Sequence, residues 1–323
     1  MEYKYDVSVI VATYNPNLYK LKSTLISIIL QKNINFEIIV TDDGSKEDYF
    51  KEVSEFFLKK NFENHSFIKN KSNIGTVNNF YNALIKSNGK YVFFISPGDM
   101  LYDENSLFSM FDFAERNKIK ICFGDAVYYS NSNNKLKIFK NIHNAPLKSL
   151  IYNDDTPFVT QKIGFLLKNY ILGATFFRNR EIAIKYIGRI KDICKYVEDN
   201  TSTAFILADN IRVYHLKKHI VWYEYGTGIS TSKNKRWNKF LDQDFDNCYE
   251  ELYNSYINDD VINAIYNTRK MSIKLSKIIY MLLNHPVVLF TILKIRLMPK
   301  SIGLQHQVNS KILEAYLKIG SEN

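Results

Sequence analysis

Two runs, Val-Ser-Val-Ile-Val-Ala at residues 7–12 and Phe-Glu-Ile-Ile-Val at residues 36–40, decide the fold of this chain. Short, nearly continuous runs of β-branched and aliphatic residues are typical of strands buried on both faces of a parallel sheet. Between the two runs, residues 18–31 carry apolar side chains at helical spacing. This spacing predicts a helix that packs on the sheet. The chain therefore begins with a strand, a helix and a second strand.

The same alternation continues to residue 95. Further helices are predicted over residues 46–60 and 76–87, the second ending at Gly89 in the usual stop position, and further strands over 66–69 and 91–95. Strands that alternate with helices indicate an α/β fold with a doubly wound, mostly parallel sheet. Beyond residue 100 the pattern is less regular. Helices are predicted at 104–116, at 180–187 and from residue 198, and the C-terminal residues 259–293 are helical in character. Strands are predicted at 121–129, 173–177 and 220–225, with a polar turn at 130–137.

Composition points to a soluble globular protein in a reducing compartment. Of the 323 residues, 46% are hydrophobic and 24% are charged, which is close to the globular average. The three cysteines, Cys122, Cys194 and Cys248, lie far apart, which argues against a disulfide framework or a structural zinc site. The first residues lack the pattern of a signal peptide, and the uncharged stretch 278–293 is too short to span a bilayer. We therefore expect a cytoplasmic protein.

The net charge of +10 is concentrated at one end of the chain. Residues 1–125 carry 15 Lys and Arg against 16 Asp and Glu, whereas residues 261–323 carry 9 against 2. A neutral first half argues against a nucleic-acid partner. A basic, aliphatic tail suits peripheral contact of residues 261–300 with the anionic inner face of the cell membrane. A helical hairpin packed on the rest of the chain, or on a second subunit in a homodimer, explains the same pattern and stays open.

Polar residues follow three of the predicted strands, where ligands of parallel sheets bind. These turns are Thr13-Tyr14-Asn15, Asp42 to Ser45, and Ser96 to Asp99. The glycine fingerprints of dinucleotide-binding and P-loop proteins are absent. A tyrosine can stack on a base, and aspartates can accept hydrogen bonds from a base or ribose or hold a divalent cation. The three turns therefore predict a nucleotide-diphosphate site that uses a metal.

The chain resembles the family 2 glycosyltransferases of the GT-A fold over about residues 5–230, in the motifs VSVIVATYN, EIIVTDDGS, NKSNIGTVNNFYNAL, GKYVFFISPGDML and VEDN. The resemblance implies an inverting transfer of a sugar from a UDP-sugar to a glycan acceptor on a lipid or protein carrier, with Mn²⁺ or Mg²⁺. Such enzymes build capsular and other bacterial surface glycans. It also implies a GT-A domain at 1–258, with a nucleotide-binding half at 1–100 and an acceptor half at 101–258, followed by a basic helical extension at 259–323.

The resemblance further implies which residues bind the donor. Tyr14 would stack on the base, and Asp43 would read the base or ribose. The remaining predicted donor-binding residues are Ala12, Thr13, Asp42, Asn73, Gly75, Thr76, Asn79 and Ser96. Simpler roles compete: Asp42 and Asp43 can form an ordinary turn with Gly44 and a cap from Ser45, and Asn73 or Thr76 can cap the following helix.

Catalytic and metal-binding residues follow from the same resemblance. The family's Asp-x-Asp is reduced to Asp99, which becomes the candidate metal ligand, although it can also merely close a Pro-Gly turn. Asp199 is the candidate general base, with Glu198 as an alternate or orienting carboxylate. The competing interpretation is that both only complement the dipole of a helix.

One loop and the histidines complete the candidate residues. Residues 223–230, with Lys233, Lys235 and Arg236 behind them, can close over the donor or form a solvated basic loop. The six histidines are scattered, and His215 and His219 flank a predicted strand, so no metal site is assigned to them.

Two other functions remain. A catalytically inactive GT-A subunit would support a partner transferase, but it would not need Asp99, Glu198 and Asp199. A sugar nucleotidyltransferase usually carries a glycine-rich loop with Arg and Lys after the first strand, and residues 13–16 offer none.

Overall fold

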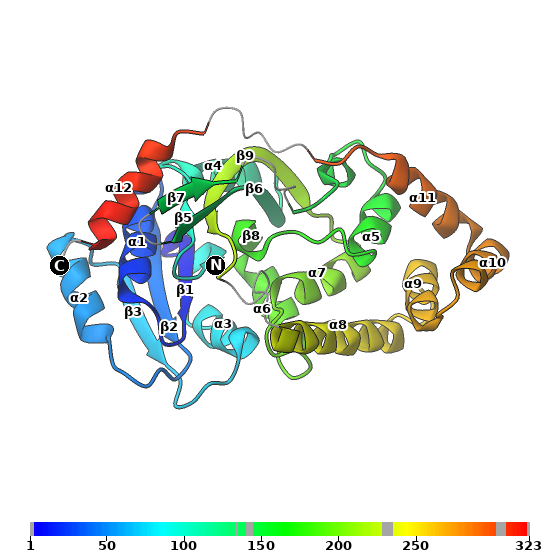
Figure 1. Cartoon of the computed structure of the whole chain (residues 1–323), viewed down its shortest axis with the longest axis horizontal. Helices are drawn as coiled ribbons and strands as arrows, with labels where there is room; N and C mark the ends of the chain where they lie inside the picture. Colours follow the sequence, from blue (N-terminus) through cyan, green and yellow to red (C-terminus); the bar gives the residue numbers. More distant parts are fainter. Residues whose placement is uncertain (1–2, 133–134, 140–144, 228–234, 302–307, 322–323) are drawn as a thin grey trace.

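The computed structural model describes residues 3–132, 135–139, 145–227, 235–301 and 308–321. Its center is a nine-stranded sheet in the order β3-β2-β1-β4-β8-β6-β9-β5, with β7 paired to β6 (Figure 1). The expected α/β fold with a mostly parallel sheet and a helical C-terminal region is confirmed. The strands are β1 (Tyr5–Thr13), β2 (Phe36–Asp42), β3 (His65–Lys69), β4 (Gly89–Ile95), β5 (Met100–Leu101), β6 (Ile121–Ser132), β7 (Lys135–Ile138), β8 (Phe176–Asn179) and β9 (Tyr214–Glu224).

The predicted parallel half is present as β3-β2-β1-β4. β1 lies between β2 and β4, with Val9 opposite Ile38 on one side and Phe93 on the other. Alternate side chains of β1 enter two separate cores, because successive residues of a strand point to opposite faces. Val9 faces α1 (Leu18–Ile29), α2 (Phe50–Lys59) and α4 (Ser106–Arg116), whereas Ile10 faces α3 (Thr76–Leu84). Both residues are fully buried, as the apolar run predicts.

The second half of the sheet is more continuous than the sequence suggests. β8 pairs antiparallel with β4 and β6, and β6 pairs in parallel with β9. The predicted polar turn at 130–137 is wrong, since β6 extends to Ser132 and pairs with β7. β9 begins at Tyr214, so His215 and His219 lie within the strand rather than beside it. Pairing with a neighbor decides these strands, and this is not visible in local periodicity.

The helices differ from prediction at their ends. α2 begins at Phe50 rather than at residue 46, and its N-cap is Tyr49 without a side-chain hydrogen bond, so the predicted cap by Ser45 is wrong. α3 ends at Leu84, and Gly89 instead opens β4. A Cβ at Gly89 would lie 2.6 Å from the carbonyl carbon of Val7, so this glycine permits close approach to β1. α5 (Phe158–Leu166) and α8 (Lys235–Ser255) were not predicted, whereas α6 (Arg180–Ile190) and α7 (Asp199–Ala208) were.

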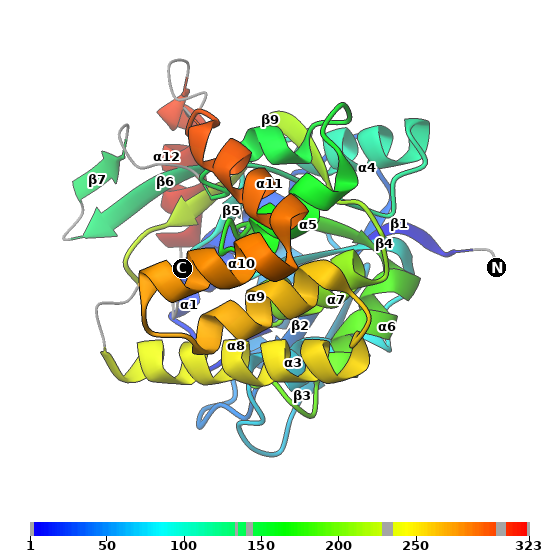
Figure 2. The same ribbon diagram turned by 90° about the vertical axis from the view of Figure 1, so that its right-hand side faces the viewer.

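The last helices pack on the body at two different places. α9 (Asp260–Lys270) packs against α5 and α8, α11 (Pro286–Leu297) packs against α5, and α10 (Lys274–Asn284) packs on α9 and α11. All three lie at the end of the molecule far from α1 (Figures 1 and 2). α12 (Ser310–Ser321) lies instead along α1, where a Cβ at Gly320 would come within 2.8 Å of the Tyr19 carbonyl oxygen. The division predicted after residue 258 falls between α8 and α9. Among the described residues, no helix is long and apolar enough to cross a membrane.

Candidate active site

A cleft of about 750 Å³ opens at the carboxyl ends of β1 and β4, between the N-termini of α3 and α7 and the start of α8. Three loops that follow parallel strands meet there, as expected for an α/β sheet. The cleft brings together residues that are up to 233 positions apart in the sequence. The predicted site residues that line it are Ala12, Thr13, Tyr14, Asp43, Asn73, Gly75, Thr76, Asn79, Ser96, Asp99, Glu198 and Asp199.

Asp42 is the predicted site residue that does not line the cleft. Its side chain is fully buried under the turn, where it accepts hydrogen bonds from the Ser45 backbone N–H at 2.9 Å and the Tyr49 hydroxyl at 3.2 Å. The Ser45 hydroxyl also donates to it. Asp42 therefore shapes the turn that presents Asp43, and Gly44 completes that turn with a φ of 77°.

Asp43 ties the end of β2 to the loop before α3. Its carboxylate accepts backbone hydrogen bonds from Ile74 at 2.9 Å and Gly75 at 3.0 Å, and one from the Asn70 amide at 3.3 Å. Burial raises the pKa of Asp43, and these hydrogen bonds oppose the shift because they favor the charged form. A carboxylate accepts about four hydrogen bonds, so Asp43 keeps capacity for a ligand in the cleft.

Gly75 joins α3 to the segment that carries the acidic pair. Its φ is +91°, and a Cβ there would lie 2.6 Å from the Lys195 carbonyl oxygen. The Val77 backbone N–H donates a hydrogen bond to the same Lys195 carbonyl oxygen. Gly75 is also the N-cap residue of α3, without a side-chain hydrogen bond, so the predicted cap by Asn73 or Thr76 is wrong.

The other predicted donor residues differ in how freely they meet the cleft. The side-chain oxygen Oδ1 of Asn79 accepts hydrogen bonds from the Thr41 hydroxyl at 2.7 Å and from the Asn70 side-chain amide at 3.0 Å, so the Asn79 side chain is held in place. Tyr14 is 51% exposed at the rim, and Ser96 is exposed as well. Tyr14 is thus available for stacking on a planar ligand.

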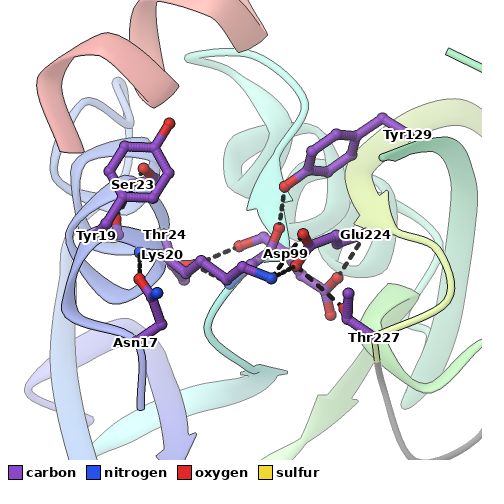
Figure 3. Close-up of polar contacts among 10 residues, drawn as sticks. Asn17, Tyr19, Lys20, Ser23, Thr24, Asp99, Tyr129, Glu224 and Thr227 are labelled. Atoms are coloured by element: carbon purple, nitrogen blue, oxygen red, sulfur yellow. Dashed lines mark hydrogen bonds and ion pairs between the residues drawn. The ribbon is translucent and has the colours of Figure 1, made fainter. Parts of the chain in front are cut away.

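Asp99 lies in a charged network that connects α1, the turn after β4 and the end of β9 (Figure 3). One Asp99 oxygen accepts the Glu224 backbone N–H at 3.0 Å. The Glu224 carboxylate forms an ion pair with Lys20, whose Nζ lies 2.7 Å from both carboxylate oxygens. The Thr227 hydroxyl donates to Glu224 at 3.1 Å. Burial raises the pKa of Asp99 to about 8; the Glu224 charge also raises it, while the Glu224 N–H and Lys20 lower it.

The network fits a divalent cation in donor type. Asp99 and Glu224 supply hard carboxylate oxygens, which Mg²⁺ and Mn²⁺ prefer. Among the described residues there is no cluster of three or more His, Cys, Asp or Glu that could hold a metal by themselves. A cation at Asp99 would therefore need oxygens from a diphosphate or from water as well.

Glu198 is clamped by a buried arginine. Its carboxylate accepts from Arg178 Nη1 at 2.7 Å, and both side chains are almost inaccessible to solvent. The Arg178 guanidinium also lies over the rings of Phe176 and Phe94, 4.5 Å and 5.5 Å from their centroids. Burial raises the pKa of Glu198 to about 7, while Arg178 lowers it and the neighboring Asp199 raises it. The Glu198 carboxylate is therefore held in one place beside Asp199.

Asp199 is the first residue of α7 and faces the cleft. Its Oδ1 accepts the Asn200 backbone N–H at 2.6 Å. A Cβ at Gly173 would overlap Oδ2 and would lie 3.1 Å from Cγ, so glycine leaves room for this carboxylate. Burial raises the pKa of Asp199, and the Asn200 N–H and Arg178 oppose the shift. A carboxylate with a raised pKa beside a cleft is suited to accept a proton.

Aromatic side chains form the wall of the cleft opposite the sheet. Tyr170 stacks on Phe245 with ring centroids 4.7 Å apart and an interplanar angle of 2°. Tyr196 lies edge-on to Trp237 at 5.3 Å. All four residues line the same cleft as Asp199. Flat aromatic surfaces next to a carboxylate suit the apolar faces of sugar rings.

Two predictions concern residues outside this network. Lys233 lies in residues 228–234, outside the described residues, so closure of that loop stays a prediction. Within β9, His215 Nε2 lies 3.0 Å from Asp125 and its ring stacks on Phe123. These contacts place His215 in the sheet rather than in the cleft. His143 and His306 lie outside the described residues.

Sequence reasoning missed Lys20, Arg178 and the aromatic residues Tyr170 and Phe245, and it treated Glu224 only as part of a loop. A signal for Arg178 was present, because one arginine follows two phenylalanines in a strand and a buried charge needs a partner. Lys20 gave no such signal. It is an ordinary helix residue until folding brings it to Glu224, 204 positions away.

Comparison with known families identifies the first half of the chain. The model of glycosyl transferase family 2 matches residues 8–186. An uncharacterized glycosyltransferase of Rickettsia bellii is 33% identical over 111 residues, which are 34% of this chain and 15% of that protein. A second one, from Methanocaldococcus jannaschii, is 29% identical over 135 residues, 42% of this chain and 46% of that protein. The chain thus spans less than half the length of either relative.

Solved structures show the same fold along most of the chain. S. aureus TarS 1–349 superimposes with a TM-score of 0.55 at 17% identity, covering 98% of this chain and 90% of TarS 1–349. The complex of the same fragment with UDP-GlcNAc gives a TM-score of 0.53 at 18% identity, over 81% of this chain and 70% of that one. At this identity the likeness shows a GT-A-like fold.

Proposed function

The chain belongs to glycosyltransferase family 2, and on this premise we propose that it transfers a sugar, with inversion, from a UDP-sugar to a glycan acceptor on a lipid or protein carrier. The observation that carries the proposal is the division of labor between two adjacent carboxylates. Arg178 engages Glu198, whereas among the described residues Asp199 forms no ion pair and faces the cleft. One carboxylate is thus held, and the other is available as a base.

In the proposed reaction, Asp199 takes the proton from the attacking acceptor hydroxyl. The acceptor oxygen forms a bond to the anomeric carbon as the bond from that carbon to the diphosphate breaks on the opposite face, so the products are the glycoside with inverted configuration and UDP. Glu198 orients the start of α7 through Arg178, and so it holds the base in place. Tyr14 stacks on the base, and Asp43 holds the loop along the ribose. We assign the catalytic machinery to residues 1–258 and treat 259–323 as an extension.

A divalent cation, Mn²⁺ or Mg²⁺, would be held by Asp99 and would supply positive charge to the leaving diphosphate. Lys20 lines the same part of the cleft and adds a fixed positive charge. The donor is proposed to be a UDP-sugar because the TarS fragment of like fold forms complexes with UDP and UDP-GlcNAc.

The aromatic wall supports a glycan acceptor. Tyr170, Phe245, Tyr196 and Trp237 offer flat surfaces near Asp199, where the acceptor hydroxyl must lie for proton transfer. Stacking on these rings would orient a sugar at modest cost in side-chain entropy, because Tyr170 and Phe245 already support each other.

The test is release of UDP from a panel of UDP-sugars with Mn²⁺, for the wild type, Asp199→Asn and the control Asp192→Asn. Asp192 is an exposed aspartate seven positions before Asp199, and its carboxylate pairs with Lys191. We expect one donor to be hydrolyzed slowly by the wild type and the control, and about 10²–10⁴-fold more slowly by Asp199→Asn. Donor binding without turnover in any sample would favor an inactive subunit instead. Absence of both would contradict the site.

A further inference from the structure

The outer faces of α10 and α11 are apolar, although α11 packs against α5 and α10 packs on α9 and α11. In α10 the exposed residues at helical spacing are Leu275, Ile278, Ile279, Leu282 and Leu283. In α11 they are Val287, Phe290, Leu293 and Leu297. Leu283 is 76% exposed and Phe290 59%. An outward stripe of nine large apolar side chains exceeds the scattered exposure that a soluble protein normally shows. We call these nine residues the apolar face.

The orientation of the two helices is fixed by their inner sides. Val288, Leu289, Ile292 and Ile295 of α11 are buried in the core beside α5. In α10, Met281 is buried, and the Tyr280 hydroxyl accepts from the Asn267 amide of α9 at 3.0 Å. Each helix therefore has apolar residues on two sides, one packed and one exposed. The exposed side is not a core face that failed to dock.

The Lys and Arg residues of the segment that carries the apolar face have no acidic residue beside them in the sequence. The sequence contains no Asp or Glu from residue 261 to residue 313 and eight Lys or Arg in the same stretch. Lys274, Lys294, Arg296 and Lys300 are exposed around the face. Among the described residues, none of these four cations forms an ion pair, although thirteen ion pairs are present elsewhere.

This combination favors an anionic bilayer over a second copy of the chain. A symmetric contact through the apolar face would bring the same cations of two copies together, and residues 261–313 of either copy supply no carboxylate to pair with them. An anionic lipid surface places negative charge beside every cation and hydrocarbon below the apolar residues. The helices are too short to cross the bilayer, so they would lie in its interfacial region.

We propose that α10 and α11 dock this enzyme on the surface of a membrane that contains anionic lipid. The apolar face enters the boundary between headgroups and acyl chains, and Lys274, Lys294, Arg296 and Lys300 contact the headgroups. Docking rests on the exposed surface alone and does not depend on the donor. If the proposed function holds, docking implies that the glycan acceptor is carried on a lipid, because an enzyme bound to the membrane surface works where lipid-linked glycans are held.

The test is flotation of the full chain with vesicles of phosphatidylcholine alone or mixed with phosphatidylglycerol. The variant Leu283→Gln with Phe290→Gln removes two residues of the apolar face. Its matched control is Leu58→Gln with Ile257→Gln, at exposures of 77% and 62% on other surfaces. All four side chains are exposed, so neither variant should unfold the protein.

We expect the wild type and the control to float with the mixed vesicles, less at high salt, and the face variant to bind about tenfold more weakly or worse. A wild type that stays unbound, or a face variant that binds as well as the control, would overturn the proposal. Sedimentation of the same samples tests whether the apolar face instead binds a second copy of the chain. If the wild type does not bind vesicles but is a dimer, and the face variant is a monomer, the apolar face is a dimer interface. UDP-sugar hydrolysis in solution should be equal in all three proteins, so failure of docking and failure of the proposed function are distinguishable.

Discussion

Arg178 of β8 donates to Glu198, the residue before α7, across 2.7 Å in a site that solvent hardly reaches. The contact connects the middle of the sheet with the helix that carries Asp199. Two of the three guanidinium nitrogens of Arg178, Nε and Nη2, have no hydrogen-bond partner, so the pair is held mainly by this contact and by the flanking rings. Removing the Arg178–Glu198 contact should therefore lower the free energy of unfolding and change the pKa of the neighboring Asp199.

Arg178→Met should destabilize the protein by about 3–5 kcal/mol, because it leaves the Glu198 carboxylate buried without its cation. Glu198→Gln added to Arg178→Met should recover part of the loss, since the uncompensated charge is then removed. Urea unfolding of both single variants and the double variant measures the coupling. Losses that simply add would show that the two side chains do not stabilize each other.

The stability of the wild type should decline as the pH rises from about 4 to about 7, because Glu198 has a pKa of about 7 in the folded chain and an ordinary one when unfolded. The folded state then binds more protons than the unfolded state across that range. Glu198→Gln cannot titrate, and it should lose this part of the slope. Thermal unfolding of both proteins over the same pH range tests the sign, and an identical slope would contradict it.

The pH profile of activity should have an acid limb at a pH above the ordinary pKa of an aspartate. Burial raises the pKa of Asp199, and Asp199 must be ionized to act as a base. Arg178 lowers that pKa, so Arg178→Met should move the acid limb of kcat/KM to still higher pH. Arg178→Lys keeps the charge and should move it less. A limb that stays in place in Arg178→Met would leave Arg178 with a structural role only.

Asp99→Asn should weaken UDP binding by about tenfold or more in the presence of Mn²⁺ and should leave it unchanged in EDTA, since one metal ligand is lost. Asp192→Asn, which makes the same chemical change at an exposed aspartate outside the cleft, is the matched control and should keep the metal dependence. Calorimetric titration of each protein with UDP, with and without Mn²⁺, separates the two effects. If the wild type, Asp99→Asn and the control all depend equally on Mn²⁺, Asp99 is not a metal ligand and only closes the turn.

Gly75→Ala should destabilize the protein by roughly 2–4 kcal/mol, because strain at a positive φ adds to the clash with the Lys195 carbonyl oxygen. Gly226→Ala is the matched control: its φ is +92°, but a Cβ there meets nothing within 4 Å. It should cost only about 1 kcal/mol. Denaturant unfolding compares the two, and similar losses would mean that the Lys195 segment moves away freely.

The sequence alone determined the parallel half of the sheet and most of the cleft that it carries. Runs such as residues 7–12 can be buried only between neighboring strands, and the polar turns that follow them must meet at one edge. Asp43 and Asp99 were placed by this logic and by the family motifs, and Asp199 was placed by the resemblance at VEDN alone; all three line the cleft. Their chemical roles remain predictions that the experiments above test.

Only the tertiary structure decided the partners of these residues. Lys20 meets Glu224, and Arg178 meets Glu198, through contacts between elements far apart in the chain. Local spacing cannot predict such contacts. The same holds for the tail, whose period indicated helices but not which side they bury. In α11, packing of Val288 and Ile292 against the core left Phe290 facing outward, because a helix that is apolar on more than one side can bury only the side that meets the body.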